Sequence, residues 1–99
     1  MLNKEIILTF LQNNFSYFQS NYHITKIGII GSFARDEQRE ESDIDLLIEF
    51  EPGTQNIFEL KFKLKEFLKK KLNRDVDICR EKYLKPYVKE YIIKEVIYV

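Results

Sequence analysis

Two apolar runs joined by a charged segment constrain the fold of this chain more than any other feature. The first run, residues 27–30, lies at the end of an expected strand over residues 24–30 and is followed by Gly31 and Ser32. The second run, residues 46–48, directly follows an Asp-Ile-Asp stretch. Short runs rich in Ile and bounded by Gly or charged residues are typical of β-strands. The second run is almost continuously apolar, which indicates a strand covered on both faces. We therefore expect two central strands of one sheet.

Two aspartates, Asp43 and Asp45, stand at the start of the second strand. Side chains alternate along a strand, so both carboxylates are expected on the same face. Two carboxylates this close repel each other, and one would stay protonated unless a cation lies between them. Carboxylate oxygens in this arrangement suit Mg²⁺, which usually takes one or two carboxylates together with substrate phosphates. The pair therefore predicts a metal site anchored by the core strand behind it.

The corner after the first strand has the residues of an anion site. Gly31 permits a tight turn and the close approach of a ligand to the backbone, and Ser32 is expected to cap a helix that begins at Phe33. Free N–H groups at such a helix start could hold phosphates beside the paired carboxylates. The alternative is an ordinary strand–turn–strand with a surface Asp pair. We favour the site, because both features occur together on adjacent core strands.

Residues 74–79 predict a third strand, which carries a second Asp-x-Asp pattern. Asp75 and Asp77 are expected on one face and the apolar residues on the other. Asp75 is interpreted as a solvated carboxylate near Arg74, and Cys79 as a small buried residue, since no base is placed beside it by the sequence.

Apolar residues at helical spacing predict three helices, over residues 1–21, 57–72 and 86–99. Asn3 is expected to cap the first helix, and Pro86 suits the first turn of the last one. Helices in this order among three strands predict an α/β (α+β) fold, a small mixed β-sheet backed by helices. Residues 1–99 are expected to form a single domain.

Gly28 and the C-terminal helix each allow more than one interpretation. Gly28, inside the first strand, marks either the close approach of a backbone or ligand or a helix packed tightly on the sheet. In the C-terminal helix, core packing is the safer assignment for Val88, Ile92 and Val96. The alternative for this aromatic and apolar helix is a surface for a partner or for a second copy of the chain, with Tyr98 at its end.

Composition narrows the function classes. The 99 residues suffice for one modest core, and the formal net charge of +0 argues against a general nucleic-acid binder. One cysteine excludes an internal disulfide, and neither a signal peptide nor a long apolar span is present, so we expect a cytoplasmic protein without membrane association. A chain of this size has little room for a second domain that holds a substrate, so if it transfers a group, the acceptor is expected to arrive as, or on, another protein.

The Gly-Ser corner and the Asp pair resemble the signature of the minimal nucleotidyltransferases of the DNA polymerase β superfamily. In that family a Gly-Ser pair is followed, one short segment later, by Asp-x-Asp; here residues 33–42 form the segment between Ser32 and Asp43. The residues around both motifs resemble those of the small antitoxin branch of this family, whose members are encoded beside toxins of the HEPN class. The resemblance covers most of the chain and implies a polymerase-β-like nucleotidyltransferase core.

The resemblance also implies the roles of individual residues. A Val-Asp-hydrophobic strand supplies the third carboxylate in the family, and Asp77 stands in that pattern here. Asp43, Asp45 and Asp77 would then be catalytic and would hold two Mg²⁺ ions, with Asp77 assisting deprotonation of the acceptor. Gly31 and Ser32 would hold the β- and γ-phosphates of ATP.

The charged segment offers two further candidates for nucleotide contact, Arg35 and Ser42. Arg35 could neutralise phosphate charge or pair with Asp36 or Glu37, and the sequence does not separate these. Ser42 is expected to bond locally to the backbone at the start of the strand. Members of the resembled branch often carry Gly where this chain has Asp36, which costs flexibility and adds a negative charge near the phosphates.

The leading hypothesis is an antitoxin that transfers AMP from ATP to a tyrosine hydroxyl of a HEPN-type toxin and so neutralises it. The resemblance supplies the acceptor, while the residues themselves supply only the site. One alternative is an antitoxin that works by binding alone. The other is a nucleotidyltransferase for a small molecule such as an aminoglycoside, which fits the site but not the missing acceptor domain.

Overall fold

The computed structural model describes residues 2–99. Residue 1, part of the first predicted helix, lies outside the described residues. In chain order the elements are α1 Lys4–Asn13, α2 Phe15–Tyr22, β1 Ile24–Ile30, α3 Gly31–Ala34, β2 Ile44–Phe50, α4 Ile57–Leu72, β3 Val76–Arg80, a 3₁₀ turn η1 Glu81–Tyr83, α5 Pro86–Glu95 and β4 Ile97–Tyr98.

The strands form one mixed sheet in the order β3-β2-β1-β4. β1 pairs antiparallel with both β2 and β4, whereas β2 and β3 run parallel and are joined through α4. A parallel pair needs a crossover of this length, so the helix between the two strands accounts for their direction. The predicted fold class, a small mixed sheet backed by helices, is confirmed.

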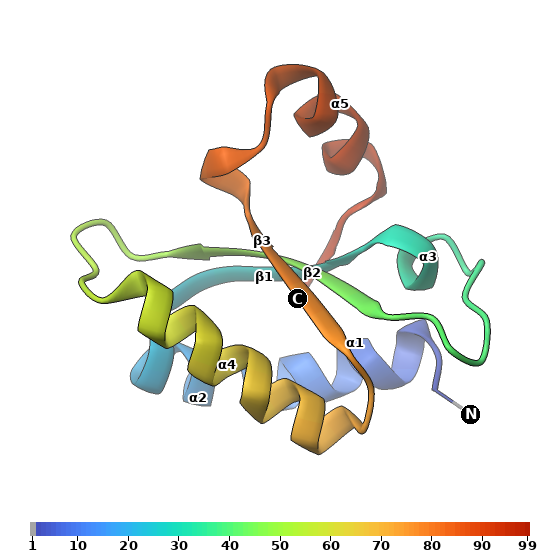
Figure 1. Ribbon diagram of the computed structural model, residues 1–99, viewed down its shortest axis with the longest axis horizontal. Coiled ribbons are helices and arrows are strands. Elements are labelled where there is room, and N and C mark those ends of the chain that lie inside the picture. Colours follow the sequence, from blue (N-terminus) through green and yellow to red (C-terminus); the bar gives the residue numbers. More distant parts are fainter. Residues whose placement is uncertain (1) are drawn as a thin grey trace.

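Helices α1, α2 and α4 cover one face of the sheet, and α5 stands on the opposite face (Figure 1). We call the second face the α5 face. Along β2, Ile44, Leu46 and Ile48 belong to the core under the three helices, while Asp45 and Glu49 alternate with them and are only half-buried. The buried residues of this core are Ile7, Leu11, Phe18, Tyr22, Ile24, Ile27, Ile29, Phe33, Ile44, Leu46, Ile48, Phe50, Leu64, Leu68, Val76 and Ile78.

The N-terminal helical segment differs from the prediction of one helix. Asn3 caps α1 as expected, because its Oδ1 accepts a hydrogen bond from the Ile6 N–H at 2.9 Å. The helix then breaks at Asn14, whose side-chain amide donates to the Phe10 carbonyl at 2.8 Å and whose backbone leaves the helical region. Asparagine often bonds to nearby backbone in this way, and an apolar pattern that continues across the break hides it.

The C-terminal segment also differs. The helix ends at Glu95, and residues 97–98 form β4 beside β1 instead of a last helical turn. Val88, Ile92 and Val96 are half-buried and lie outside the core, so their core assignment was wrong. Gly28 is explained by β4, since a Cβ there would overlap the Ile97 carbonyl oxygen.

Two residues at the third strand also have surroundings that differ from those expected. Cys79 is exposed, because it alternates with the core-facing Ile78 and lies on the α5 face. Asp75 is solvated as expected, but its partner is Lys69, at 3.5 Å, and not Arg74. None of the helices described between residues 2 and 99 combines the length and the apolar character needed to cross a membrane.

Candidate active site

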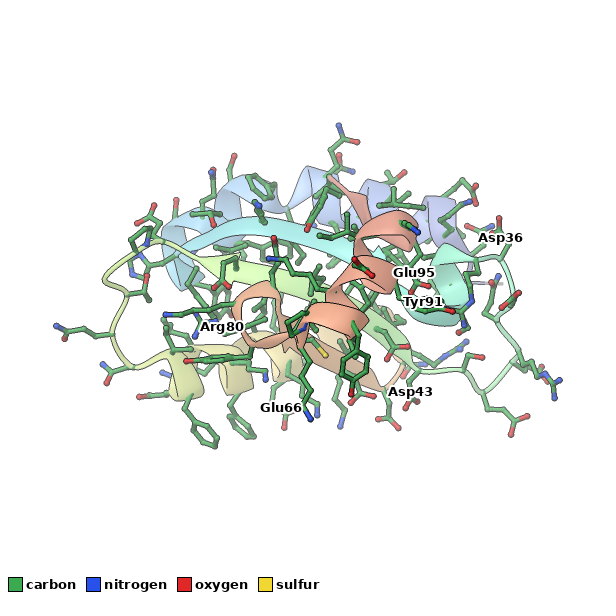
Figure 2. The ribbon with its side chains drawn as sticks, turned by 90° about the horizontal axis from the view of Figure 1, so that it is seen from above. Asp36, Asp43, Glu66, Arg80, Tyr91 and Glu95 are labelled. Carbon is green, nitrogen blue, oxygen red and sulfur yellow. The ribbon has the colours of Figure 1, made fainter. Side chains whose placement is uncertain are left out.

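The pairing of β2 with β3 brings two of the predicted carboxylates together. In this parallel ladder Asp45 is the direct register partner of Asp77, and Ile44 is that of Val76. Since Ile44 and Val76 point into the core, Asp45 and Asp77 both point to the α5 face. Asp43 lies one residue before β2 and is exposed. Figure 2 looks onto this face and shows Asp43 at the end of the sheet near α3, with α5 crossing above the strands.

The electrostatics of Asp45 show that the other carboxylates are close to it. Its pKa is raised above the usual value, first by burial and then by the negative charges of Asp77 and Asp43. Glu95 raises the pKa further, and Arg35 is the one nearby cation that lowers it. Because a positive charge between the carboxylates would relieve this repulsion, the arrangement favours a bound cation.

The donor set fits Mg²⁺ in a particular way. Within residues 2–99, no three acidic, histidine or cysteine side chains, Asp43, Asp45 and Asp77 included, converge closely enough to hold a metal ion together. Mg²⁺ seldom needs a complete protein cage, since it is commonly held by one or two carboxylates plus substrate phosphates and water. The assignment of Asp43, Asp45 and Asp77 as its ligands stays a prediction.

Gly31 joins the strand to this cluster. Its φ of +76° lies in the left-handed region that favours glycine, and a Cβ at this position would overlap the carboxylate of Asp45. The tight turn expected at Gly31 is present, and the group that approaches its backbone closely is the Asp45 carboxylate. The approach of a ligand to this backbone stays a prediction.

The helix after β1 begins two residues earlier than predicted, at Gly31 instead of Phe33. α3 spans Gly31–Ala34, so Ser32 is a helical residue, the capping position is Ile30, and no side chain caps this helix. The capping role expected for Ser32 is wrong, because the left-handed glycine lets the helix start directly at the strand end. The predicted contact of Ser32 with nucleotide phosphates stays a prediction.

Glu95, at the end of α5, is a member of the site that the sequence did not reveal. Its Oε2 accepts a hydrogen bond from the Gly31 N–H at 2.6 Å, and its Oε1 accepts one from Arg35 Nη1 at 2.9 Å. The side chain of Glu95 is 22% exposed. No local pattern could have marked this residue, which lies 64 positions from Gly31 in the chain.

The other candidates of the charged segment have partners of their own. Arg35 pairs with Glu37 at 2.7 Å as well as with Glu95, and both carboxylates raise the pKa of its guanidinium. Asp36 adopts a positive φ of 58° and pairs with Lys4 at 3.0 Å instead of with Arg35. The left-handed backbone at Asp36 gives a reason why Gly would suit this position.

Ser42 behaves as expected from its place before the strand. Its Oγ accepts a hydrogen bond from the Arg39 N–H at 2.7 Å, and its carbonyl accepts one from Arg74 Nη1 at 2.8 Å. The local backbone bond is confirmed. Since the hydroxyl oxygen is used within the connecting segment, Ser42 orders the approach to Asp43, and a contact with nucleotide stays a prediction.

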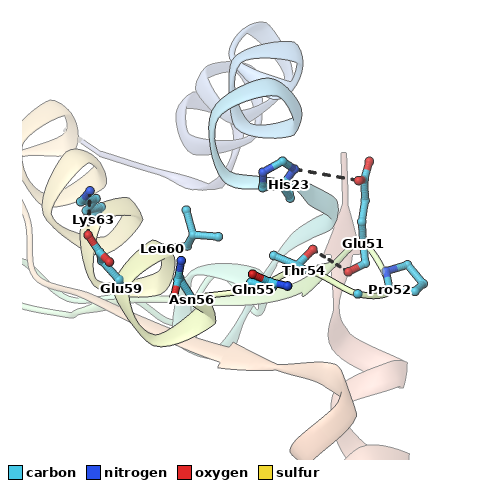
Figure 3. Close-up of a pocket in the computed structure, with 10 residues that line it drawn as sticks. His23, Glu51, Pro52, Thr54, Gln55, Asn56, Glu59, Leu60 and Lys63 are labelled. Atoms are coloured by element: carbon cyan, nitrogen blue, oxygen red, sulfur yellow. Dashed lines mark hydrogen bonds and ion pairs between the residues drawn. The ribbon is translucent and has the colours of Figure 1, made fainter.

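A pocket of about 510 Å³ lies at the other end of the sheet and does not include the carboxylates (Figure 3). It is lined by His23, by the turn after β2 and by the start of α4, and His23 Nδ1 lies 3.9 Å from Glu51 Oε2. β2 has seven residues, so this pocket is about 20 Å from Asp45 at roughly 3.3 Å per residue. It contains no group placed for the chemistry of the aspartates.

Comparisons with known proteins identify the family to which this chain belongs. Residues 7–99 match the family model described as a nucleotidyltransferase domain. The chain belongs to this family. The nucleotidyltransferase is 32% identical over 101 residues to protein adenylyltransferase MntA of Thermococcus cleftensis, covering 100% of this chain and 98% of the relative. The predicted family and enzyme class, a nucleotidyltransferase related to protein adenylyltransferases, are confirmed.

Solved structures agree with this assignment. A structure described provisionally as a minimal nucleotidyltransferase superposes with a TM-score of 0.80 at 31% identity, covering 97% of this nucleotidyltransferase and 95% of the other chain. A chain of a toxin–antitoxin structure with AMP-PNP gives a TM-score of 0.67 at 22% identity, covering 98% of this chain and 72% of that one. At 22% identity, this similarity shows only that the two chains share a fold.

Proposed function

We propose that this nucleotidyltransferase is a cytoplasmic antitoxin that transfers AMP from ATP, with Mg²⁺, to a tyrosine hydroxyl of a HEPN-type toxin and thereby neutralises it. The observation that carries the proposal is the register of β2 and β3, which sets Asp45 beside Asp77 on the α5 face. The relative named protein adenylyltransferase and the toxin–antitoxin structure with AMP-PNP support the same acceptor class and the same nucleotide.

In this proposal the chain mainly positions the reactants. The tyrosine oxygen attacks the α-phosphorus of ATP, the bond from that phosphorus to the bridging oxygen breaks, and pyrophosphate leaves. Asp77, exposed on the α5 face, lies where it could accept the phenol proton. Asp43, Asp45 and Asp77 would hold Mg²⁺, which when bound lowers the pKa of the acceptor hydroxyl and stabilises the charge on the leaving group.

The phosphates would meet the corner between β1 and α3. The Gly31 N–H and the Arg35 guanidinium are donors near the aspartates, and both hold the Glu95 carboxylate in this structure. Fixed donors of this kind stabilise a developing negative charge without reorganisation during the reaction. Asp43 is exposed beside this corner, so an acceptor carried on a second protein can approach the site.

The test mixes the protein with its toxin, ATP and Mg²⁺ and measures the intact mass of the toxin. The wild-type protein should add AMP to the toxin. Asp43→Ala and Asp45→Ala should each reduce the rate by at least about 100-fold, the scale reported for loss of one electrostatic group at a reacting centre. Asp75→Ala is the matched control, because Asp75 is exposed and paired with Lys69 away from the site, and it should transfer at the wild-type rate.

No added mass with the wild-type protein would contradict the proposal. Neutralisation of the toxin in cells by the Asp43→Ala protein would instead favour an antitoxin that works by binding alone. Transfer to an aminoglycoside but not to the toxin would favour a small-molecule acceptor.

A further inference from the structure

We infer that Glu95 occupies the position of a nucleotide phosphate, so that ATP binds only after this side chain is displaced. Glu95 is then an affinity-determining residue of the nucleotide site, and α5 is the element that carries it in and out. The inference rests on the proposed function, since it concerns the same nucleotide, and nothing in the family assignment itself points to Glu95.

The contacts of Glu95 are those expected of a bound oxyanion. Its two carboxylate oxygens are shared between a backbone donor, the Gly31 N–H at 2.6 Å, and a charged donor, Arg35 Nη1 at 2.9 Å. Gly31 belongs to the corner where the family resemblance places the phosphates, and Arg35 is a candidate of the charged segment for neutralising phosphate charge. A phosphate oxygen and this carboxylate oxygen cannot occupy the same position next to Gly31, so the two compete.

Glu95 is held in place although other carboxylates lie near it. It lies close enough to Asp45 to raise the pKa of that carboxyl, in a cluster that already contains Asp43 and Asp77. Like charges at this distance repel. The donors at Gly31 and Arg35 therefore attract an anion strongly enough to hold a carboxylate beside other carboxylates.

The attachment of α5 to the rest of the chain suits a movable element. None of its residues is buried. Within residues 2–99, the side-chain hydrogen bonds between α5 and other elements are the two made by Glu95. Figures 1 and 2 show α5 as an arch above the sheet, reached through η1 on one side and β4 on the other. Besides the Glu95 contacts, α5 has half-buried apolar residues, and its flanking segments are held by the pairing of β4 with β1 and by the hydrogen bond from the Tyr98 hydroxyl to Glu81.

The consequence for affinity follows from competition. If only the fraction of molecules with Glu95 displaced can bind nucleotide, the apparent dissociation constant rises in inverse proportion to that fraction. Because Glu95 makes two hydrogen bonds as a charged acceptor, losing this internal competitor should tighten nucleotide binding by about tenfold or more. Glu95→Gln keeps an acceptor without the charge and should give a smaller gain.

The experiment titrates the wild-type, Glu95→Ala, Glu95→Gln and Glu90→Ala proteins with AMP-PNP and Mg²⁺ in a calorimeter. Glu90 is the matched control, because it is an exposed glutamate on the same helix with a different facing direction. In parallel, hydrogen exchange of the Gly31 amide is measured without nucleotide. We expect tighter binding and faster Gly31 exchange in Glu95→Ala, wild-type behaviour in Glu90→Ala, and intermediate binding in Glu95→Gln.

The possible failures are distinguishable. Equal or weaker AMP-PNP binding by both Glu95 variants, with normal binding by the wild type, would overturn the role of Glu95 and leave the proposed function intact. Absence of binding by every protein would remove the nucleotide site, and the proposed function with it. If Glu95→Ala does not fold, Glu95→Gln with its folded spectrum decides the question by the same titration.

Discussion

At the scale of single residues, Gly31 carries more constraints than any other position near the site. Its backbone has a positive φ of 76°, its missing side chain leaves room for the Asp45 carboxylate, and its N–H donates to Glu95. The first two demands favour glycine, and the third needs a residue with a backbone N–H. The backbone conformation of the corner and the positions of the Asp45 and Glu95 carboxylates therefore all depend on Gly31.

The first prediction concerns this glycine and compares it with Gly53. Both have positive φ, 76° and 82°, but a Cβ at Gly53 meets no atom within 4 Å. Gly53→Ala should therefore cost only the left-handed strain, roughly 1–2 kcal/mol. Gly31→Ala adds the overlap with Asp45, so its unfolding free energy should fall by at least about 1 kcal/mol more, and AMP transfer should be lost. Urea unfolding and toxin mass measure the two effects.

Equal unfolding free energies for the two alanine variants would show that the corner relaxes around a Cβ. In that case the close contact between Gly31 and Asp45 would not be required for the fold, although transfer could still depend on it.

At the scale of elements, an ion pair connects β3 to β2. It lies just before the segment that leads to α5. Glu49 Oε2 accepts from Arg80 Nε at 2.9 Å and from Nη2 at 2.7 Å, and Glu49 Oε1 accepts from the Lys82 N–H at 2.9 Å. Both side chains are largely covered, 20% and 10% exposed for Glu49 and Arg80. Burial alone would raise the pKa of Glu49, but the hydrogen bonds from the Phe50 N–H, Arg80 and Lys82 outweigh it and lower the pKa.

The second prediction follows from the sign of that shift. A carboxylate whose folded pKa lies below its unfolded value stabilises the fold above the unfolded pKa, and this contribution disappears as pH falls through the folded pKa. Glu49→Gln should lower the unfolding free energy by about 1–3 kcal/mol at neutral pH and flatten its dependence on pH in the acidic range. Thermal unfolding at several pH values measures this.

The exposed pair of Glu59 with Lys63, at 3.0 Å on α4, provides the control. Glu59→Gln should change the unfolding free energy by no more than about 0.5 kcal/mol. A similar small effect for Glu49→Gln would mean that the strand pairing alone, without the ion pair, positions β3.

At the scale of the whole molecule, the hydrophobic core and the candidate site occupy opposite faces of the same sheet. The core lies between the strands and the layer of α1, α2 and α4, and the carboxylates lie on the α5 face. Alternation along each strand separates the two sets of side chains. Substitutions on the site face can therefore change activity while leaving the main core packing in place.

The third prediction of this section tests the core side of that division. Leu64 on α4 is fully buried, whereas Phe62 on the same helix is 58% exposed. Leu64→Ala should lower the unfolding free energy by about 2–5 kcal/mol, a large part of the roughly 5–15 kcal/mol expected of a small domain. Phe62→Ala should stay within about 0.5 kcal/mol of the wild type. A large loss in Phe62→Ala would place that ring in packing that this structure lacks.

The parts predictable from the sequence are those set by short-range spacing. Strand alternation is enough to put Asp43 and Asp45 before a buried run, and the glycine at position 31 marks the tight corner. Asp77 needed the family resemblance, because its own Asp-x-Asp context does not tell it from Asp75. The pairing of Asp77 with Asp45 then depends on the parallel register, which is a property of the folded sheet.

The parts that escaped prediction depend on contacts between distant segments. The apolar pattern of the last segment suits a helix, but the edge of β1 next to Gly28 offers hydrogen bonds that draw residues 97–98 into a strand. Glu95 looks like any surface glutamate of a helix until α5 is placed above Gly31. The break at Asn14 comes from a single side-chain hydrogen bond that periodicity does not register.

The order of these segments along the chain has a consequence for synthesis on the ribosome. A nascent polypeptide that has emerged only to the end of α4 already contains β1, β2, the glycine corner and two of the aspartates. The third carboxylate, Asp77, and the glutamate over Gly31, Glu95, both come from the last quarter of the chain, 18 residues apart. The protein therefore acquires its complete set of aspartates, and after them the side chain that covers its corner, only once α4 has been synthesised.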